Sequence, residues 1–328
     1  MLVYLLLCFT SNNSWSIRRQ TKSLSTVMAN NEMSSIKRLL VLGQSGLLAQ
    51  SVSKVARKQG YDVFTLSREQ GADLSTLKAG DFLSEALERM RPTLIINATG
   101  ITDLNYCEVN PERAWMLHAR LPALIAELAN KTQCPWVHVS TDHYFNGQEN
   151  VLHSELDTPK PPNTYAASKL AGEALALTSP TALVIRTNII GRRGWPNQPN
   201  FAEWVMECLI KQKPFDAYTD TWASSIEVTQ FSELALVLAE NGQAGLLNVG
   251  CSDAISKAEL IEKIAHRAGY ATHFMNKVPT PNSGQVRRAN AMGLDCSKAR
   301  KRLSDLEESL PSVDEVVEAL VKSFSEQK

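Results

Sequence analysis

The chain has 328 residues, and its 34 basic side chains balance 34 acidic ones, so the formal net charge is zero. This balance gives no basic field for a nucleic-acid partner, and a hydrophobic content of 44% is typical of a globular protein with a sizeable core. Six scattered cysteines favour reduced thiols over a disulfide framework, and neither they nor the six histidines cluster as metal ligands would, so no metal is expected.

The first 35 residues differ in composition from the rest. Residues 1–9 are apolar, and no acidic residue occurs before Glu32. The apolar run is too short to span a bilayer, so no membrane partner is expected. A targeting segment is one interpretation. A translated upstream stretch ahead of a start at Met28 or Met33 is the other, and we favour it because the remaining sequence is typical of a cytoplasmic enzyme. Organellar or secretory targeting stays open.

A nucleotide-binding turn follows this extension. Residues 37–43 combine a charged start with Leu and Val and end in Gly43, and Gly46 and Ala49 follow at a spacing typical of a strand, a tight turn and a helix. The glycines allow the backbone to approach a pyrophosphate at the helix N-terminus. A second strand at 61–66 lies at the distance that a βαβ unit requires, and this context favours a dinucleotide site.

The rest of the first half alternates strands with helices, which predicts an α/β fold with a doubly wound parallel sheet. Such sheets bind ligands at the carboxyl ends of their strands. After residue 190 the strands shorten, so we expect a Rossmann domain over 36–190 and mainly a smaller substrate-binding α/β lobe over 191–328. The predicted elements are strands at 94–100, 136–140 and 182–186, and helices at 81–90, 111–129, 164–177, 201–211, 229–240 and 257–268.

The strongest chemical signal follows the strand at 136–140. Thr141 comes directly after that strand, and Tyr165 and Lys169 lie four residues apart on the next predicted helix, hence on one face. An ammonium group at that distance can lower the pKa of a phenol, which a tyrosine general acid needs because its ordinary pKa is about 10. Each residue alone could be structural, but the glycine turn upstream favours a catalytic group.

With these residues in place, the chain resembles the extended short-chain dehydrogenases/reductases, and within them the dTDP-4-dehydrorhamnose reductase family of sugar-nucleotide reductases. The similar stretches are 41–49, 95–108, 137–147, 159–173 and 294–298. The segment 140–147, STDHYFNG, is close to the family's STDYVFDG, and 161–173, PPNTYAASKLAGE, is close to P-x-N-x-Y-G-x-S-K-x-x-G-E.

The resemblance implies a role for each matching residue. Tyr165 would protonate the sugar oxygen, Lys169 would hold the nicotinamide ribose and bias the tyrosine, and Thr141 would hydrogen-bond the carbonyl. A nucleotide sugar is the implied substrate, and a homodimer is compatible with this class. The implied cofactor contacts are Gly43, Ser45, Gly46, Leu47, Arg68, Asp73, Leu74, Ala98, Thr99, Gly100 and Lys169.

Several positions depart from the family pattern and bear on substrate shape. His118 stands where a helix Asn is usual, and His143 replaces the Tyr after Ser-Thr-Asp. Asn188 stands where a substrate-facing Trp is common. We expect Asp142, His143 and Asn188 to face the substrate, together with Arg287, which can meet a diphosphate bidentately.

The choice of cofactor depends on the end of the second predicted strand. An acidic residue there would accept a hydrogen bond from the adenosine ribose and repel a 2′-phosphate. The sequence instead has Ser67 and Arg68. A hydroxyl and a cation favour NADP(H) over NAD(H).

The leading hypothesis is therefore NADPH-dependent reduction of a 4-keto nucleotide sugar, as in deoxysugar biosynthesis. One alternative is a regulatory subunit that binds NADP without catalysis, resembling the β subunit of methionine adenosyltransferase. The altered residues His118, His143 and Asn188 fit relaxed sugar chemistry, whereas intact Thr141 and Tyr165 argue for an enzyme. A nucleotide-sugar epimerase or dehydratase is the other alternative.

Overall fold

Six parallel strands form the central sheet, in the order β10-β5-β4-β3-β1-β2. The register pairs Leu42 at the end of β1 with Leu66 of β2 and Asn97 of β3, so the carboxyl ends of these strands meet at one edge. The predicted parallel sheet is confirmed. The strands are β1 (Arg38–Leu42), β2 (Asp62–Leu66), β3 (Leu94–Asn97), β4 (Trp136–Val139), β5 (Ala182–Arg186) and β10 (Gly245–Asn248).

The computed structural model describes residues 36–147, 151–195, 197–281 and 286–326. Residues from Lys37 onward form one unit. The prediction of an extension over residues 1–35 lies outside the described residues. Among the helices that are described, none has both the length and the apolar character needed to cross a membrane.

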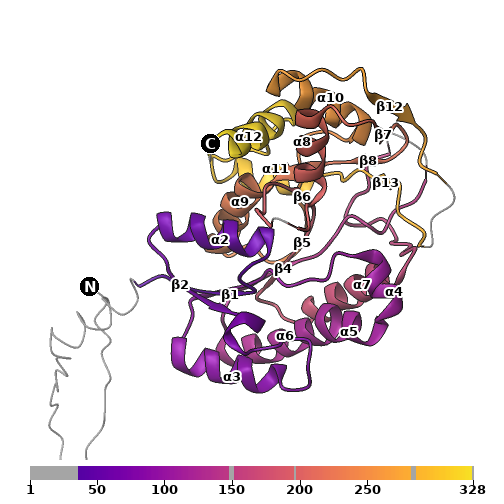
Figure 1. The fold of residues 1–328 in the computed structure, drawn as a ribbon. Coiled ribbons are helices and arrows are strands. Elements are labelled where there is room, and N and C mark those ends of the chain that lie inside the picture. Colours follow the sequence, from indigo (N-terminus) through magenta and orange to yellow (C-terminus); the bar gives the residue numbers. More distant parts are fainter. Residues whose placement is uncertain (1–35, 148–150, 196, 282–285, 327–328) are drawn as a thin grey trace, which may run out of the picture. The chain divides into compact units, whose positions relative to one another are not determined.

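Helices cover both faces of the sheet (Figure 1). The alternation along β1 explains this arrangement: Leu39 and Val41 pack on one helical layer, whereas Leu40 and Leu42 pack on the other. The first layer contains α2 (Leu47–Lys58), α9 (Val228–Glu240) and α11 (Ser297–Ser304), and the second contains α3 (Ala79–Met90), α6 (Leu121–Thr132) and α7 (Thr164–Ala176).

The helix predicted over 111–129 is interrupted. It consists of α5 (Pro111–Trp115), a π-helical turn η2 (Met116–Arg120) and α6. Pro122 explains the interruption, because it has no N–H to donate to the carbonyl of His118 and its ring crowds that carbonyl. A short helix, α4 (Leu104–Val109), precedes this run.

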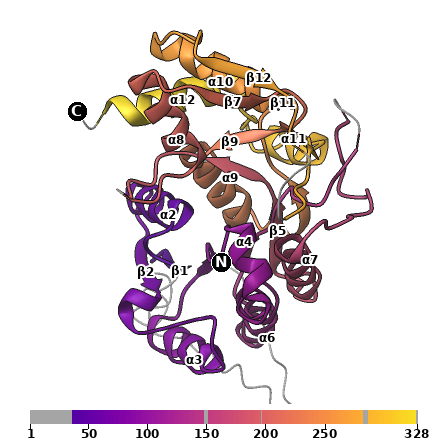
Figure 2. The same cartoon turned by 45° about the vertical axis from the view of Figure 1, so that its right-hand side comes forward.

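A second lobe lies over the carboxyl edge of the sheet (Figure 2). Its separate hydrophobic cluster is built mainly by α8 (Phe201–Lys211), α10 (Lys257–Ala268) and α12 (Val313–Ser325). The chain crosses between lobes more than once, because α9 and β10 return to the main sheet from beyond residue 191. The short strands pair as β6 (Asn188–Ile190) with β9 (Ser225–Glu227), β7 (Phe215–Tyr218) with β12 (Met275–Val278), and β8 (Trp222–Ala223) with both β11 (Ile255–Ser256) and β13 (Ala291–Met292).

Candidate active site

A cavity of about 510 Å³ lies where the sheet edge meets the second lobe, and the predicted catalytic residues Thr141, Tyr165 and Lys169 all line it. The same cavity is lined by side chains that follow β3 and β4 and by others from β6 and α10. Among the other predicted site residues, Gly46, Leu47, Ala98, Thr99, Gly100, Asp142, His143 and Asn188 also line it, whereas Gly43, Ser45, Arg68, Asp73, Leu74 and Arg287 do not.

Thr141 is held by the backbone that leaves β4. The Ser140 N–H donates to the Ile185 carbonyl at 2.7 Å, so the chain stays attached to β5 for one residue beyond the strand. The Thr141 hydroxyl then accepts from the His143 N–H at 3.2 Å. These contacts fix a hydroxyl, 5% exposed, at the cavity wall.

Tyr165 sits in the first turn of α7, whose start is firmly capped. The Asn163 side chain accepts from the Ala166 N–H at 2.8 Å, and Glu108 accepts from both the N–H and the hydroxyl of Thr164 at 2.7 Å. The phenol ring packs edge-on against two imidazoles, those of His118 at 5.5 Å and His143 at 5.9 Å between centroids.

Burial raises the pKa of Tyr165 to about 12, and hydrogen bonding to the Thr141 hydroxyl opposes that rise. The expectation that Lys169 lowers the pKa of this phenol is therefore wrong for this geometry. The reason is that the Lys169 ammonium donates to the Val139 carbonyl at 2.6 Å. Its own pKa falls to about 8 through burial, although Glu173 one turn further along α7 favours the charged form. At neutral pH the phenol is protonated and the lysine carries its charge.

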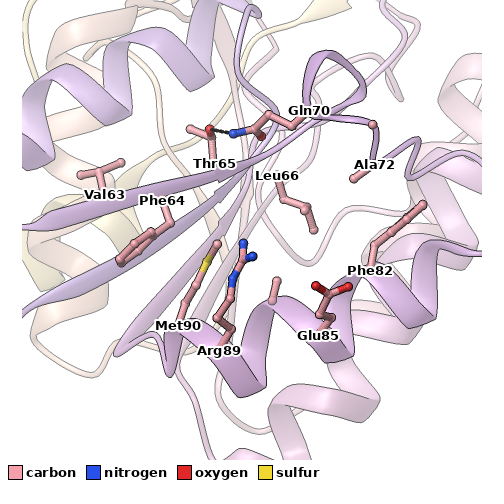
Figure 3. Close-up of a pocket in the computed structure, with 12 residues that line it drawn as sticks. Val63, Phe64, Thr65, Leu66, Gln70, Ala72, Phe82, Glu85, Arg89 and Met90 are labelled. Carbon is pink, nitrogen blue, oxygen red and sulfur yellow. Dashed lines mark hydrogen bonds between the residues drawn. The ribbon is translucent and has the colours of Figure 1, made fainter.

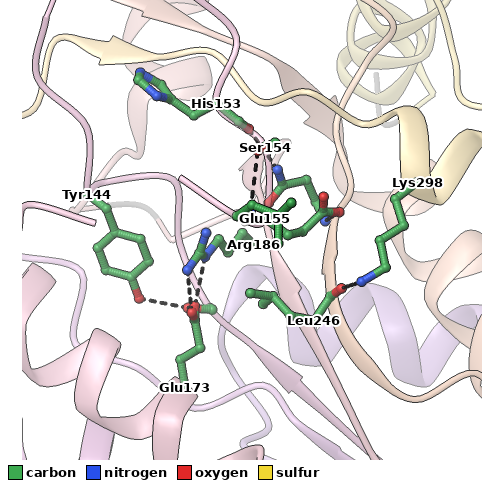
Figure 4. Close-up of polar contacts among 11 residues, drawn as sticks. Tyr144, His153, Ser154, Glu155, Glu173, Arg186, Leu246 and Lys298 are labelled. Atoms are coloured by element: carbon green, nitrogen blue, oxygen red, sulfur yellow. Dashed lines mark hydrogen bonds and ion pairs between the residues drawn. The ribbon is translucent and has the colours of Figure 1, made fainter. Parts of the chain in front are cut away.

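A buried ion pair anchors α7, the helix that carries Tyr165 and Lys169, to the sheet (Figure 4). Glu173 on α7 accepts from the Arg186 guanidinium at 2.5 and 3.0 Å, and both side chains are less than 5% exposed. The Ser140 hydroxyl donates to the same carboxylate at 3.0 Å and is 2.8 Å from the Tyr144 phenol. The network ties together α7, β5 and the segment after β4, which are the elements that carry or flank Thr141, Tyr165 and Lys169.

The turn between β1 and α2 suits a dinucleotide pyrophosphate. Gly43 has a φ of +104°, a backbone conformation that residues other than glycine rarely adopt. Gly46 is the N-cap of α2 with no side-chain cap, and a Cβ added there would meet only open space. A helix N-terminus with uncapped N–H groups and room in front of it favours an anion. The residues at this turn therefore fit a bound nucleotide.

A carboxylate that sequence reasoning missed lies just beyond β2, where the sequence predicts the adenosine ribose. Arg68 opens a short turn, η1 (Arg68–Gln70), and is exposed, as the NADP(H) hypothesis requires. Glu69 follows it and accepts from the Ser45 hydroxyl at 2.6 Å. That hydrogen bond, with a smaller contribution from Arg68, lowers the pKa of Glu69. A cation and an anion therefore stand side by side beyond β2.

Asp73 and Leu74 have their side chains committed elsewhere. The Asp73 carboxylate pairs with Arg113 at 2.9 Å and caps Ser75, and Leu74 is 4% exposed within the core. The predicted cofactor contacts of Asp73 and Leu74 therefore stay a prediction.

A chain of polar groups crosses from the sheet to the second lobe. The Asn188 amide donates to Asp142 at 2.7 Å, and its carbonyl oxygen accepts from the Ser225 hydroxyl at 2.9 Å. Asp142 is 2% exposed, and burial raises its pKa to about 7. Burial, with the charges of Lys257 and Arg288, lowers the pKa of His143 to about 4, and its buried Nε2 has no partner among the described residues.

Two cations of the second lobe, Lys257 and Arg288, line the cavity, and neither was among the predicted site residues. Lys257 is the first residue of α10, and burial together with the charge of Arg288 lowers its pKa. The sequence signal was the capping box from Ser256 to Glu259, which places Lys257 at a helix start. Arg288 lines the cavity, whereas its neighbour Arg287, which was predicted to face the substrate, does not, and both residues are exposed.

Arg193 and Trp195 close the cavity near the nucleotide turn. The Arg193 guanidinium lies over the Trp195 ring at 3.9 Å, and the indole N–H donates to the Ser45 carbonyl at 3.1 Å. Both follow β6 in a loop without periodic pattern, so sequence analysis could not place them.

A second cavity, of about 500 Å³, lies between the edge strand β2 and α3 (Figure 3). Phe64, Leu66 and Phe82 line it, and none of the predicted catalytic residues does. Within the described part of the chain, no group of three or more His, Cys, Asp or Glu side chains is placed to hold a metal ion.

Comparison with known families decides the relationship. The family described as RmlD substrate binding domain matches residues 37–322. The chain belongs to this family. This membership agrees with the suspected resemblance to the dTDP-4-dehydrorhamnose reductase family.

Individual relatives extend over most of the chain. The "Probable low-salt glycan biosynthesis reductase Agl14" of Haloferax volcanii is 28% identical and covers 87% of this chain and 98% of its own. A dTDP-4-dehydrorhamnose reductase of Salmonella typhimurium is 29% identical over 74% of this chain and 83% of its own. The crystal structure of a dTDP-4-dehydrorhamnose reductase from Bacillus anthracis in complex with NADP is 20% identical with a TM-score of 0.78, covering 89% of this chain and all of its own, and shows the same fold.

Proposed function

We propose that this protein reduces a 4-keto nucleotide sugar with NADPH, as a dTDP-4-dehydrorhamnose reductase does. The observation that carries the proposal is that Thr141, Tyr165 and Lys169 line one cavity with the backbone after β3 and the cations of the second lobe. A nicotinamide cofactor, when bound, supplies the hydride, and the protein supplies orientation, charge and a proton.

Proton transfer is assigned to Tyr165. Its pKa of about 12 keeps the phenol protonated throughout the neutral range, so the donor form is always present. The Thr141 hydroxyl stands beside it and can donate to the same carbonyl oxygen, stabilising negative charge that develops there. Lys169 lies one helical turn away on the same face of α7 and lines the same cavity, and its positive charge is assigned to holding the nicotinamide ribose.

The sugar and its nucleotide are assigned to the opposite wall. The unpartnered Nε2 of His143 is a hydrogen-bonding group for a sugar hydroxyl. Lys257 and Arg288 present two positive charges that suit the diphosphate of a nucleotide sugar. NADP(H) is the proposed cofactor because Arg68 is free to meet a 2′-phosphate, and the structurally similar Bacillus anthracis enzyme is described in complex with NADP. Five buried free thiols support work in a reducing compartment such as the cytoplasm.

The test is to incubate the purified full chain with NADPH and a panel of 4-keto dTDP- and GDP-sugars, following loss of the reduced nicotinamide absorbance. One sugar should be consumed, and Tyr165→Phe should lower turnover by about 10²–10⁴-fold with NADPH affinity unchanged, because only the proton donor is lost. Tight NADPH binding without turnover of any sugar would favour the regulatory-subunit hypothesis, which is then tested by adding the protein to a methionine adenosyltransferase.

A further inference from the structure

His118 lies between the loop that follows β3 and the helix α7. It lies in the π-helical turn η2, is 1% exposed, and its ring stands nearly perpendicular to that of Tyr165. The residue is not one of the groups that line the cavity, so it touches neither a substrate nor the reacting atoms directly.

Both ring nitrogens of His118 have partners, and the partners fix which nitrogen carries the proton. The Ile101 backbone N–H points at Nε2 over 2.9 Å, and an N–H can only donate, so Nε2 is the acceptor. The proton of the neutral ring is therefore on Nδ1, which donates to the Ser168 hydroxyl at 2.9 Å. Ser168 in turn donates to the Tyr165 carbonyl at 2.9 Å. Burial, with the nearby Lys169 charge, lowers the pKa of His118 to about 3, so the ring stays neutral.

The backbone of His118 is held as firmly as its ring. A Cβ added at Gly172 would lie 1.8 Å from the His118 carbonyl oxygen, so only glycine permits α7 to approach the π-helical turn this closely. Gly172 is one turn beyond Ser168 on α7, on the same helix face. The π-helical turn thus places the His118 ring where it contacts both α7 and the loop after β3.

We propose that His118 is a positioning residue that joins the loop after β3 to the helix that carries Tyr165, through a neutral imidazole with its proton on Nδ1. Thr99 and Gly100 in that loop line the cavity immediately before Ile101, so the connection sets the distance between the cofactor side of the site and the phenol. Its kinetic test rests on the proposed reductase function, whereas the tautomer is measurable without any reaction.

The two halves of the connection can be cut separately. Gln at position 118 can retain an acceptor for the Ile101 N–H, Asn can retain a donor for Ser168, and Ala retains neither. His118→Ala should lower kcat by roughly 100-fold, the effect of a displacement of about 1 Å, while KM and the NADPH dissociation constant stay within about twofold. His118→Gln and His118→Asn should each recover part of kcat, and Ser168→Ala should cost less when added to His118→Ala than it costs alone. An unchanged kcat in a folded His118→Ala variant, or losses that simply add, would overturn the proposal.

Nitrogen NMR tests the tautomer in the protein alone. With 15N-labelled histidine, the ring signals that disappear in His118→Gln belong to His118. They should report a protonated Nδ1 and a bare Nε2 from pH 5 to pH 9, with no titration. A proton on Nε2, or a cationic ring within that range, would overturn the assignment even if no sugar substrate is found. If the spectrum is as expected but no sugar is turned over, the tautomer and the contacts of His118 still stand. That result would instead count against the reductase function.

Discussion

The Asp142 carboxylate and the Asn188 amide meet at 2.7 Å, and this contact joins the segment after β4 to the first strand of the second lobe. Because Asn188 also accepts a hydrogen bond from Ser225 on β9, two successive hydrogen bonds link a buried acid to the second lobe. The charge of Asp142 also raises the pKa of Tyr165. The protonation state of this carboxyl therefore affects both stability and the catalytic acid.

The first prediction concerns pH and stability. The pKa of Asp142 is raised from 3.8 to about 7 in the folded protein, so between about pH 4 and pH 7 the folded state holds a proton that the unfolded chain has released. The protonated Asp142 carboxyl therefore contributes fully to the stability of the folded state below about pH 4, and this contribution is lost as the pH rises through about 7. Asp142→Asn cannot ionise, so its melting temperature relative to the parent should rise from pH 4 to pH 8.

The difference between the pKa of Asp142 in the folded and the unfolded protein corresponds to about 4 kcal/mol at most in the free energy of unfolding. The exposed Asp62→Asn serves as the control and should change little between these pH values. A melting difference for Asp142→Asn that is the same at pH 4 and pH 8 would contradict the assignment.

The second prediction concerns the ion pair under the catalytic helix. Glu173→Gln leaves the Arg186 guanidinium buried without its carboxylate, which should cost about 3–5 kcal/mol in the free energy of unfolding. Urea denaturation measures this loss. The double variant Glu173→Leu with Arg186→Met removes both charges and should recover much of the stability, because the desolvation penalty goes with them. A single variant that loses less than about 1 kcal/mol would show that the pair contributes little.

The third prediction concerns the cofactor. Arg68→Asp should weaken NADPH binding by about 10–100-fold and leave NADH binding nearly unchanged, because only the 2′-phosphate loses a partner. Glu69→Gln is the matched control at the next residue. It removes a negative charge near the same position and should tighten NADPH binding by up to about fivefold. Fluorescence titration of both cofactors measures each affinity, and equal affinities for NADPH and NADH in the parent would remove the basis of the NADP(H) proposal.

The sequence predicts the parts of this site that depend on local spacing. Gly43 and Gly46 determine their own turn, Tyr165 and Lys169 determine their shared helix face, and the alternation of strands and helices brings Thr141 to the same sheet edge. Lys257 and Arg288 come from segments more than 80 residues beyond Lys169 in the printed sequence, and no periodic pattern indicates which lobe surface they face. The pKa of Tyr165 could not be predicted either, because it depends on burial and on where the Lys169 ammonium points.

His118 illustrates the same limit. The sequence marks it only as a departure from the family pattern, and Pro122, four residues later, is the local cause of the π-helical turn. The partners Ile101 and Ser168 lie 17 and 50 residues away, so their meeting depends on how α7 packs on that turn.

The last prediction concerns the substrate anion. Lys257 lies on the cavity wall close enough to Arg288 for the two charges to repel each other. Its ammonium also lies 5.1 Å from the centroid of the Phe201 ring and is attracted by the charge of Asp142. A diphosphate between Lys257 and Arg288 would relieve that repulsion. Lys257→Met should therefore raise KM for the nucleotide sugar by about 10–100-fold, the effect of one charge-assisted hydrogen bond, with kcat and the NADPH dissociation constant little changed. Added salt should weaken sugar binding in the parent more than in the variant.

Lys54→Met changes an exposed lysine on α2; it is the control and should leave KM unaltered. An unchanged KM in Lys257→Met would move the diphosphate away from this wall, whereas a fall in kcat alone would instead place Lys257 beside the reacting carbonyl.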